Sequence, residues 1–229
     1  MTAYNLFRTC VLILCIGAGS AWAQTFKMPC EVEGVIPDLD DRKVKAEKVV
    51  VEIQSMGKNI FLRLNGSKYY FVTVSSLTTD AGGEVNVNGG SVTTTAEQVY
   101  NDALKMTGNT TLKGSSVKFN AAATGTGALI VDGAATIKGG TVTTTGAQTY
   151  KGAVTLESDT VLSSTSGGDI AFMTTLDGAQ ALEVKTSGIT TFTSTVGGTS
   201  PLKSLITDAP GSVRVSASAV KTSGLQTYN

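Results

Sequence analysis

The chain has 229 residues, with 18 Lys and Arg balanced by 18 Asp and Glu, and it contains no histidine. A neutral chain without a block of basic residues argues against nucleic acid and anionic membranes as partners. The lack of histidine excludes histidine-based catalytic triads and most catalytic zinc sites. Composition therefore favours a protein that is not an enzyme, and it predicts no cofactor and no metal.

Residues 1–23 have the features of a secretory signal peptide. A positively charged start is followed by a short apolar run at Val11–Ala18, and Ala21–Ala23 supplies small residues before a cleavage site. A lipoprotein signal ending at Cys15 is the alternative, but Leu14 stands where a small residue is preferred. No later stretch is long and apolar enough to span a membrane. We expect an exported protein that does not span the membrane, located at the cell surface or outside the cell, with the periplasm as the alternative.

Cleavage after residue 23 leaves Cys30 as the one remaining cysteine, so no intramolecular disulfide can form. Cys30 is a poor candidate nucleophile, because no histidine is available to activate it, and an incidental thiol is the favoured interpretation. Stability must then come from packing and backbone pairing.

Composition divides the rest of the chain into two parts. Residues 24–76 hold 15 charged residues in 53, whereas residues 77–229 hold 20 in 153 and are rich in threonine and glycine. Three apolar-rich runs in the first part predict a small antiparallel β meander: KVVVEIQS, NIFLRL and YYFVTVSS. Asn65-Gly66 between two of these runs is the signal for a tight hairpin turn.

Residues 77–229 read as a repeat array. Ser76–Asn101 aligns without a gap on Ser204–Asn229, and 13 of the 26 positions are identical. A shorter segment, Ser91–Tyr100, nearly recurs at Thr141–Tyr150 and again at Ala219–Tyr228. The offsets differ, which indicates insertion or loss of whole turns of a stackable unit, and we interpret each copy as a rung of that stack.

Apolar residues in the array recur as pairs two positions apart, which places both side chains on one face of a short strand. The pairs are Val85/Val87, Val117/Phe119, Leu129/Val131, Val154/Leu156, Ile170/Phe172, Leu182/Val184 and Val213/Val215. Short threonine-rich strands separated by glycine predict a parallel β-helix, a solenoid of about six or seven coils with about 20–25 residues each. A β-sandwich is the alternative fold, but a sandwich does not tolerate insertion of whole turns.

The stretch GAQTYKGAVTLESDTVLSSTSGGDIAF, with the repeats that follow it, resembles the degenerate repeats of bacterial surface proteins of the filamentous-haemagglutinin type. The resemblance covers residues 77–229. It implies a right-handed β-helix used as an adhesin, with an unknown surface receptor or glycan as partner. The amino-terminal secretion domain of that family is absent, and residues 24–76 stand in its place. The array is expected to be truncated part-way through a repeat.

Acidic residues are the remaining option for catalysis, because some β-helix enzymes cleave polysaccharides with clustered carboxylates. The candidates lie beside glycine or in turn segments, which favours a role in turns; they are Asp132, Asp159, Asp169, Asp177 and Asp208. SGGDIAF is a single imperfect fragment of a calcium-binding nonapeptide. No residue is therefore assigned as catalytic, cofactor-binding or metal-binding.

Tyr100, Tyr150 and Tyr228 recur at the end of each short repeat. They could form a binding row, but we expect each ring to cover the edge of a coil while its hydroxyl group stays in water. The charged segment Asp38–Lys48 could bind a partner, although a solvated loop is favoured.

These observations predict a non-enzymatic, exported structural or adhesin-like protein that displays a β-helical rod at the cell surface. The alternative is a periplasmic binding module, residues 24–76, with a fused repeat tail, and a carbohydrate-active enzyme ranks third. A solenoid that stops without a cap leaves strand edges open. We therefore expect fraying from Val213 onward and end-to-end self-association, with the meander capping the other end at the Val85/Val87 rung.

Overall fold

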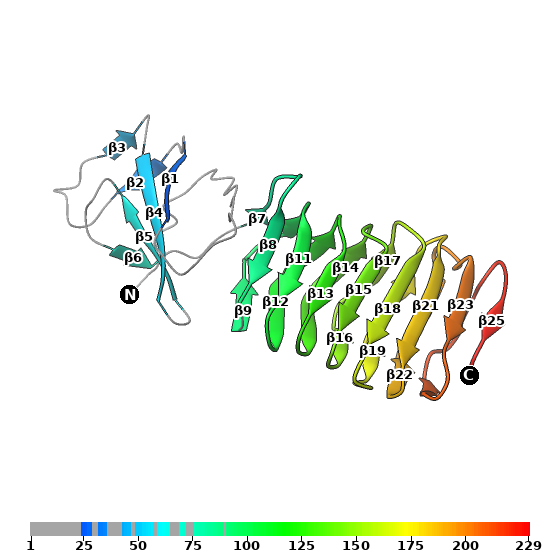
Figure 1. Cartoon of the computed structure of the whole chain (residues 1–229). Coiled ribbons are helices and arrows are strands. Elements are labelled where there is room, and N and C mark those ends of the chain that lie inside the picture. The colour runs from blue at the N-terminus through cyan, green and yellow to red at the C-terminus, as the bar shows by residue number, and fades with distance from the viewer. Residues whose placement is uncertain are drawn as a thin grey trace. The chain divides into compact units, whose positions relative to one another are not determined.

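The computed structural model describes residues 76–88 and 90–229 and, between residues 24 and 71, the backbone of six strands. The chain divides into two compact units with the main boundary at residues 73–74 (Figure 1). Among the described residues all regular structure is β, and none forms a helix that could cross a membrane.

The first unit contains a four-stranded antiparallel sheet in the order β1-β4-β5-β6. Its strands are β1 (Gln24–Met28), β4 (Val49–Met56), β5 (Asn59–Leu64) and β6 (Tyr69–Phe71). A separate antiparallel pair is formed by β2 (Val32–Val35) and β3 (Lys43–Ala46). The predicted meander of β4, β5 and β6 is confirmed, and β1 adds an edge strand that we did not predict. Cys30, the Asn65-Gly66 turn and most of Asp38–Lys48 lie outside the described residues.

The second unit is a parallel β-solenoid with three strand-bearing faces, A, B and C, and every pairing between its strands is parallel. Face A contains β9 (Gly90–Thr93), the first half of β12 (Thr110–Phe119), the first half of β14 (Leu129–Ile137), β16 (Gln148–Tyr150), β19 (Ile170–Phe172), β22 (Ile189–Phe192) and β24 (Ser212–Val215). Face B contains β7 (Leu77–Thr78), β10 (Gln98–Tyr100), the second halves of β12 and β14, β17 (Val154–Leu156) and β20 (Leu176–Asp177). The predicted parallel β-helix is confirmed, and the sandwich alternative is wrong.

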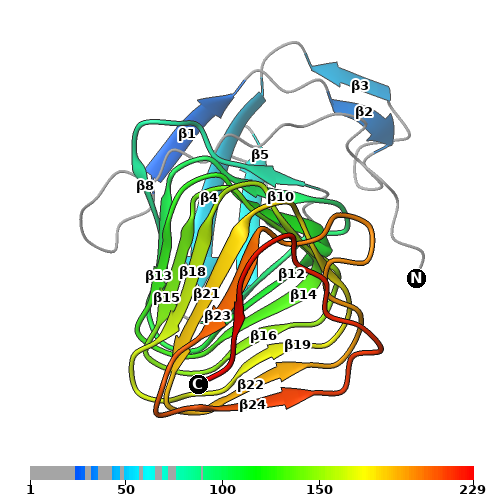
Figure 2. The same ribbon diagram turned by 90° about the vertical axis from the view of Figure 1, so that its right-hand side faces the viewer.

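Face C has one strand for each of eight successive coils. The strands are β8 (Glu84–Val87), β11 (Ala103–Met106), β13 (Ala123–Gly125), β15 (Thr141–Thr144), β18 (Thr160–Ser164), β21 (Ala181–Thr186), β23 (Ser204–Thr207) and β25 (Gln226–Thr227). Seen end-on in Figure 2, face C lies along one side of the coil and β16, β19, β22 and β24 of face A along another.

The coils are shorter at the start of the solenoid than our sequence analysis predicted. Val85, Leu104, Ala123 and Val142 pair in succession on face C, so each of these coils takes 19 residues. Later coils are longer, and the step from Val142 to its partner Leu162 already takes 20. The chain therefore fits eight coils where six or seven were expected.

Tight corners make the short coils possible. β12 and β14 each continue through the corner between faces A and B, where Gly114 and Gly133 stack on one another, followed by Gly152. A Cβ atom at Gly133 would lie 2.1 Å from the Gly114 carbonyl oxygen, and one at Gly152 would lie 2.2 Å from the Gly133 oxygen. Glycine is needed here because the backbones of successive coils touch.

The interior of the solenoid is built from the predicted apolar pairs. Both members are buried in five of the seven pairs: Val117/Phe119, Leu129/Val131, Val154/Leu156, Ile170/Phe172 and Leu182/Val184. The Val85/Val87 pair has one buried and one half-buried member, and Val213/Val215 in the last coil is the most exposed. Inward side chains of neighbouring coils stack, and the rings of Phe172 and Phe192 lie parallel with centroids 5.2 Å apart. Burial against the coils above and below is therefore what holds each coil in place.

The ring column gives a test of this packing. Phe172 is fully buried between Tyr150 and Phe192, whereas the next residue, Met173, is 47% exposed. Phe172→Ala should lower the free energy of unfolding by about 3–5 kcal/mol, since it leaves a cavity in the column. Met173→Ala should change it by less than about 0.5 kcal/mol. Urea unfolding followed by circular dichroism measures both, and equal losses would contradict the assignment of inward and outward positions.

Candidate functional site

The repeated ten-residue segment forms a corner between two faces of the solenoid in all three places. Ser91–Tyr100 connects face A to face B, Thr141–Tyr150 connects face C to face A, and Ala219–Tyr228 connects face B to face C. Each copy thus lies in a coil of the stack, but the three copies do not lie over one another, because each joins a different pair of faces. The same local structure is used once at each of the three corners.

A buried glutamine holds the corner together, most completely in the second copy. The Gln148 side-chain nitrogen lies 3.1 Å from the Val142 carbonyl oxygen and 3.2 Å from the Thr144 hydroxyl oxygen. It also lies 2.9 Å from the carbonyl oxygen of Ser163 in the following coil. The Gln148 side-chain oxygen accepts a hydrogen bond of 2.9 Å from the Tyr150 hydroxyl. Gln148 and Tyr150 are both fully buried, so each polar group is satisfied inside the corner.

The first copy has the same contacts. Gln98 reaches the Val92 carbonyl at 3.0 Å, the Thr94 hydroxyl at 3.4 Å and the carbonyl of Lys113 in the following coil at 2.8 Å. Tyr100 donates to the Gln98 side-chain oxygen at 2.9 Å. One ten-residue pattern therefore specifies one set of hydrogen bonds, whichever faces it joins.

The third copy has the contacts within the corner, and among the described residues no segment lies over its outer side. Gln226 reaches the Val220 carbonyl at 3.3 Å and the Thr222 hydroxyl at 3.1 Å, and Tyr228 donates to Gln226 at 3.0 Å. In contrast to the buried copies, Tyr228 is 43% exposed. The local pattern thus gives the same hydrogen bonds within the corner in all three copies.

A threonine shapes the turn in each copy. The hydroxyl groups of Thr94, Thr144 and Thr222 donate to the backbone carbonyl oxygen two residues on, at 2.8, 2.6 and 2.7 Å. This local bond is the usual use of threonine in a turn. It also orients the hydroxyl oxygen so that the glutamine amide can donate to it.

Our expectation that the tyrosine hydroxyl groups stay in water is wrong for Tyr100 and Tyr150. Both rings are buried, and each stacks on a phenylalanine of the following coil: Tyr100 on Phe119 at 6.2 Å and Tyr150 on Phe172 at 5.4 Å between centroids. Burial raises the pKa of both hydroxyl groups well above the usual range. The three tyrosines lie at different corners, so they do not form a binding row.

Three of the acidic candidates belong to one coil but lie on different parts of it: Asp159 precedes β18, Asp169 precedes β19 and Asp177 is in β20. Most of the acidic candidates accept backbone N–H groups from a neighbouring coil. Asp169 accepts from Ile189 at 2.8 Å, Asp177 from Thr199 at 2.8 Å, and Asp208 from Thr186 at 2.8 Å. Asp132 forms an exposed ion pair with Lys151. Within the described residues no three His, Cys, Asp or Glu side chains come together as a metal site. These carboxylates connect coils, which is a structural use of the charge.

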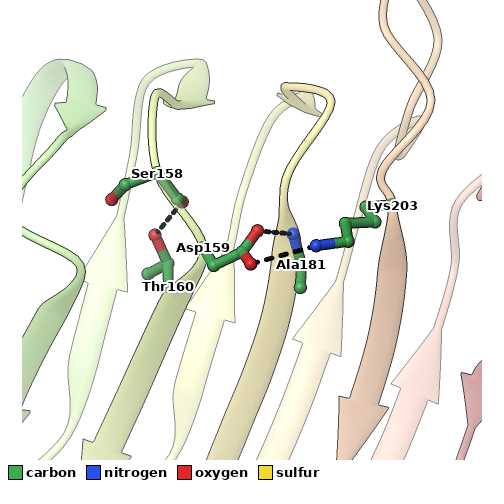
Figure 3. A network of polar contacts seen from close by, with 5 residues as sticks. All are labelled: Ser158, Asp159, Thr160, Ala181 and Lys203. Carbon is green, nitrogen blue, oxygen red and sulfur yellow. Dashed lines mark hydrogen bonds and ion pairs between the residues drawn. The ribbon is translucent and has the colours of Figure 1, made fainter.

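Asp159 makes the most extended of these connections, across three successive coils (Figure 3). One carboxylate oxygen accepts a 2.9 Å bond from the Ala181 N–H, and the other lies 3.2 Å from the Lys203 ammonium group. The Ala181 hydrogen bond, followed by that of Lys203, lowers the pKa of Asp159. Both charged side chains are more than half exposed, so the ion pair adds little stability.

Sequence reasoning missed the role of the glutamines. Gln98 and Gln226 stood out as identical positions in the long repeat, yet no function was assigned to them. The signal was the fixed spacing of valine, threonine, glutamine and tyrosine in all three copies. A buried amide needs several partners, and this spacing supplies them from one short segment.

The fold defines the chain as a β-solenoid protein. Comparison with protein-family models, with curated proteins and with solved structures gives no match.

Replacement of the glutamine should lower the free energy of unfolding more at the buried corner than at the exposed one. Gln148→Leu leaves the Tyr150 hydroxyl and the Ser163 carbonyl without their partner, and should cost about 2–5 kcal/mol of unfolding free energy. Gln226→Leu, at the exposed corner, should cost less than about 1 kcal/mol. Urea midpoints at constant m-value measure the difference. Similar midpoints for the two variants would show that the amide does not hold the corner.

Alkaline pH should destabilise the protein through the buried tyrosines. The pKa of each hydroxyl group is raised in the folded protein. Its contribution to the free energy of unfolding is therefore fully present below pH 10, which is about the pKa of tyrosine in the unfolded chain. The contribution is lost as the pH rises towards the pKa in the folded protein. Each buried tyrosine should contribute a slope of about 1.4 kcal/mol per pH unit above pH 10. Tyr150→Phe should reduce the slope by that amount, and the half-exposed Tyr228→Phe should reduce it less. Urea unfolding at several pH values gives the slopes. Identical slopes for the two variants would contradict the burial of the Tyr150 hydroxyl group.

Proposed function

We propose that this chain is an exported, non-enzymatic structural protein whose solenoid forms a rod for display or adhesion at the cell surface, with a receptor or glycan as partner. The observation that supports this proposal is the use of the polar side chains. The buried glutamines connect successive coils, and so do most of the acidic candidates. A rod needs such connections, whereas a catalytic site needs polar groups that converge on one point.

The distribution of the ion pairs supports the same proposal. Lys105–Glu84, Lys118–Glu97 and Lys151–Asp132 each join neighbouring coils on the outside of the solenoid. They compensate charge between neighbouring coils at three places on the outside of the solenoid. Such a surface suits a neutral, extended display scaffold more than the capture of a highly charged substrate.

A periplasmic binding function of the first unit is the second candidate. The observation in its favour is that this unit is compact by itself and contains its own antiparallel sheet of β1, β4, β5 and β6. In that case the solenoid would be a fused tail, and binding activity would reside in residues 24–76.

Labelling of intact cells tests the proposal against this alternative. An antibody against the solenoid, used with added protease on unbroken producing cells, should label the cell surface and lose its epitope on digestion. Purified protein should bind host cells or a glycan array, and should not degrade polysaccharides. Detection only after the outer envelope is opened would favour the periplasmic candidate. Polysaccharide cleavage that Asp169→Asn abolishes would overturn the non-enzymatic proposal.

A further inference from the structure

The middle of face C carries outward hydroxyl side chains on three neighbouring strands, β13, β15 and β18, which lie side by side in Figures 1 and 2. Three of these side chains lie opposite one another in the parallel register and form one column along the rod: Thr124, Thr143 and Ser163. The next outward position of each coil gives a second column, Thr126, Thr145 and Thr165, which the backbone hydrogen bonds between coils keep in step. We call these six residues the hydroxyl patch.

Strand geometry fixes the spacing of the hydroxyl patch in two directions. Successive coils lie about 4.8 Å apart, and positions two residues apart along a strand lie about 6.6 Å apart. The coils have nearly equal length here, since the step from Ala123 to Val142 takes 19 residues and the step from Val142 to Leu162 takes 20. The buried Gln148 amide also joins β15 to β18 through the Ser163 carbonyl. The patch is therefore a regular grid on a fixed support.

The hydroxyl groups of the first column are available to a ligand. Among the described residues, none forms a hydrogen bond with the hydroxyl group of Thr124, Thr143 or Ser163. In the second column the Thr126 hydroxyl oxygen accepts the Gly108 N–H at 3.0 Å, which leaves its own hydrogen atom free to donate.

The hydroxyl patch is also uncharged. Strands β13, β15 and β18 contain no charged residue. The first column reaches charged side chains at Lys105 in the coil before the patch and at Lys185 in the coil after it. The same three strands contain no aromatic residue on which a sugar ring could stack. The patch therefore suits a ligand that is neutral, flat and rich in hydrogen-bonding groups.

We propose that the hydroxyl patch is an ice-binding site, with the surface of crystalline ice as its ligand. Ice is an uncharged lattice of oxygen atoms that repeat at fixed spacings in two directions. Each threonine hydroxyl group can donate and accept a hydrogen bond, as a water molecule of the lattice does. The methyl groups between the hydroxyl groups are apolar and order the water around them. Ice binding goes beyond display or adhesion and does not depend on either.

Inhibition of ice recrystallisation is the first test. The purified protein should slow the growth of ice grains in a frozen sucrose solution. Thr143→Lys, at the centre of the patch, should raise the concentration needed at least about tenfold, because its ammonium group would have to lose water against the ice. Thr124→Lys, in the neighbouring coil, should act in the same way. Thr149→Lys is the matched control, because Thr149 lies at an outward position of β16 on face A, and it should have little effect.

A single ice crystal supplies the second measurement. Fluorophore-labelled protein should coat particular planes of the growing crystal, and the Thr143→Lys protein should not. Thermal unfolding of the variants checks that the solenoid remains folded. Grain growth as fast as with an equal amount of serum albumin would overturn the proposal. Equal effects of the patch variants and Thr149→Lys would overturn it as well. Neither result bears on surface display, which labelling of intact cells tests separately.

Discussion

Parallel backbone pairing between successive coils is the constraint on which the rest of the solenoid depends. Each short strand finds its hydrogen-bonding partners in the coils before and after it, as β15 does with β13 and β18. A coil cannot bury its own inward residues, because the stacked side chains that cover them belong to its neighbours. Side chains are consequently selected for what they contribute to the next coil. Apolar pairs, stacked rings, corner glycines and acceptor carboxylates are four solutions to that one requirement.

The corner formed by glutamine and tyrosine shows that the same short sequence can join any two of the three faces. A segment with the same valine, threonine, glutamine and tyrosine joins A to B, C to A, and B to C, with hydrogen bonds that differ by only a few tenths of an ångström. The long repeat follows the same rule: Ser76–Asn101 begins on face B, whereas its partner Ser204–Asn229 begins on face C. A repeat can therefore move from one face to the next along the sequence without any loss of local structure. Unequal repeat offsets are then expected in a solenoid of this kind.

The sequence was sufficient to predict the all-β class, the parallel solenoid and most of the inward positions. An apolar pair such as Ile170/Phe172, two positions apart, indicates a strand and the face of it that is buried. The place of each corner could not be predicted, since it depends on coil lengths that vary on face C from 19 residues between Val85 and Leu104 to 23 between Val184 and Thr207. The buried tyrosines were missed for a related reason. A tyrosine hydroxyl group is expected to be hydrated. The glutamine two residues earlier, which accepts its hydrogen bond, is a residue type that is usually exposed, so the sequence alone does not indicate this contact.

The same geometry that joins coils also supports the proposal that the protein is not an enzyme. An aspartate such as Asp169 or Asp208, whose oxygen accepts a backbone N–H of a neighbouring coil, is held at a fixed place on its own coil. Successive coils repeat such single bonds along the rod, whereas an acid–base pair needs two carboxyl groups that face each other across a substrate. The carboxylates that make such bonds are held singly by backbone N–H groups, which favours the proposed structural role. What remains available for recognition is the outward surface of the three faces.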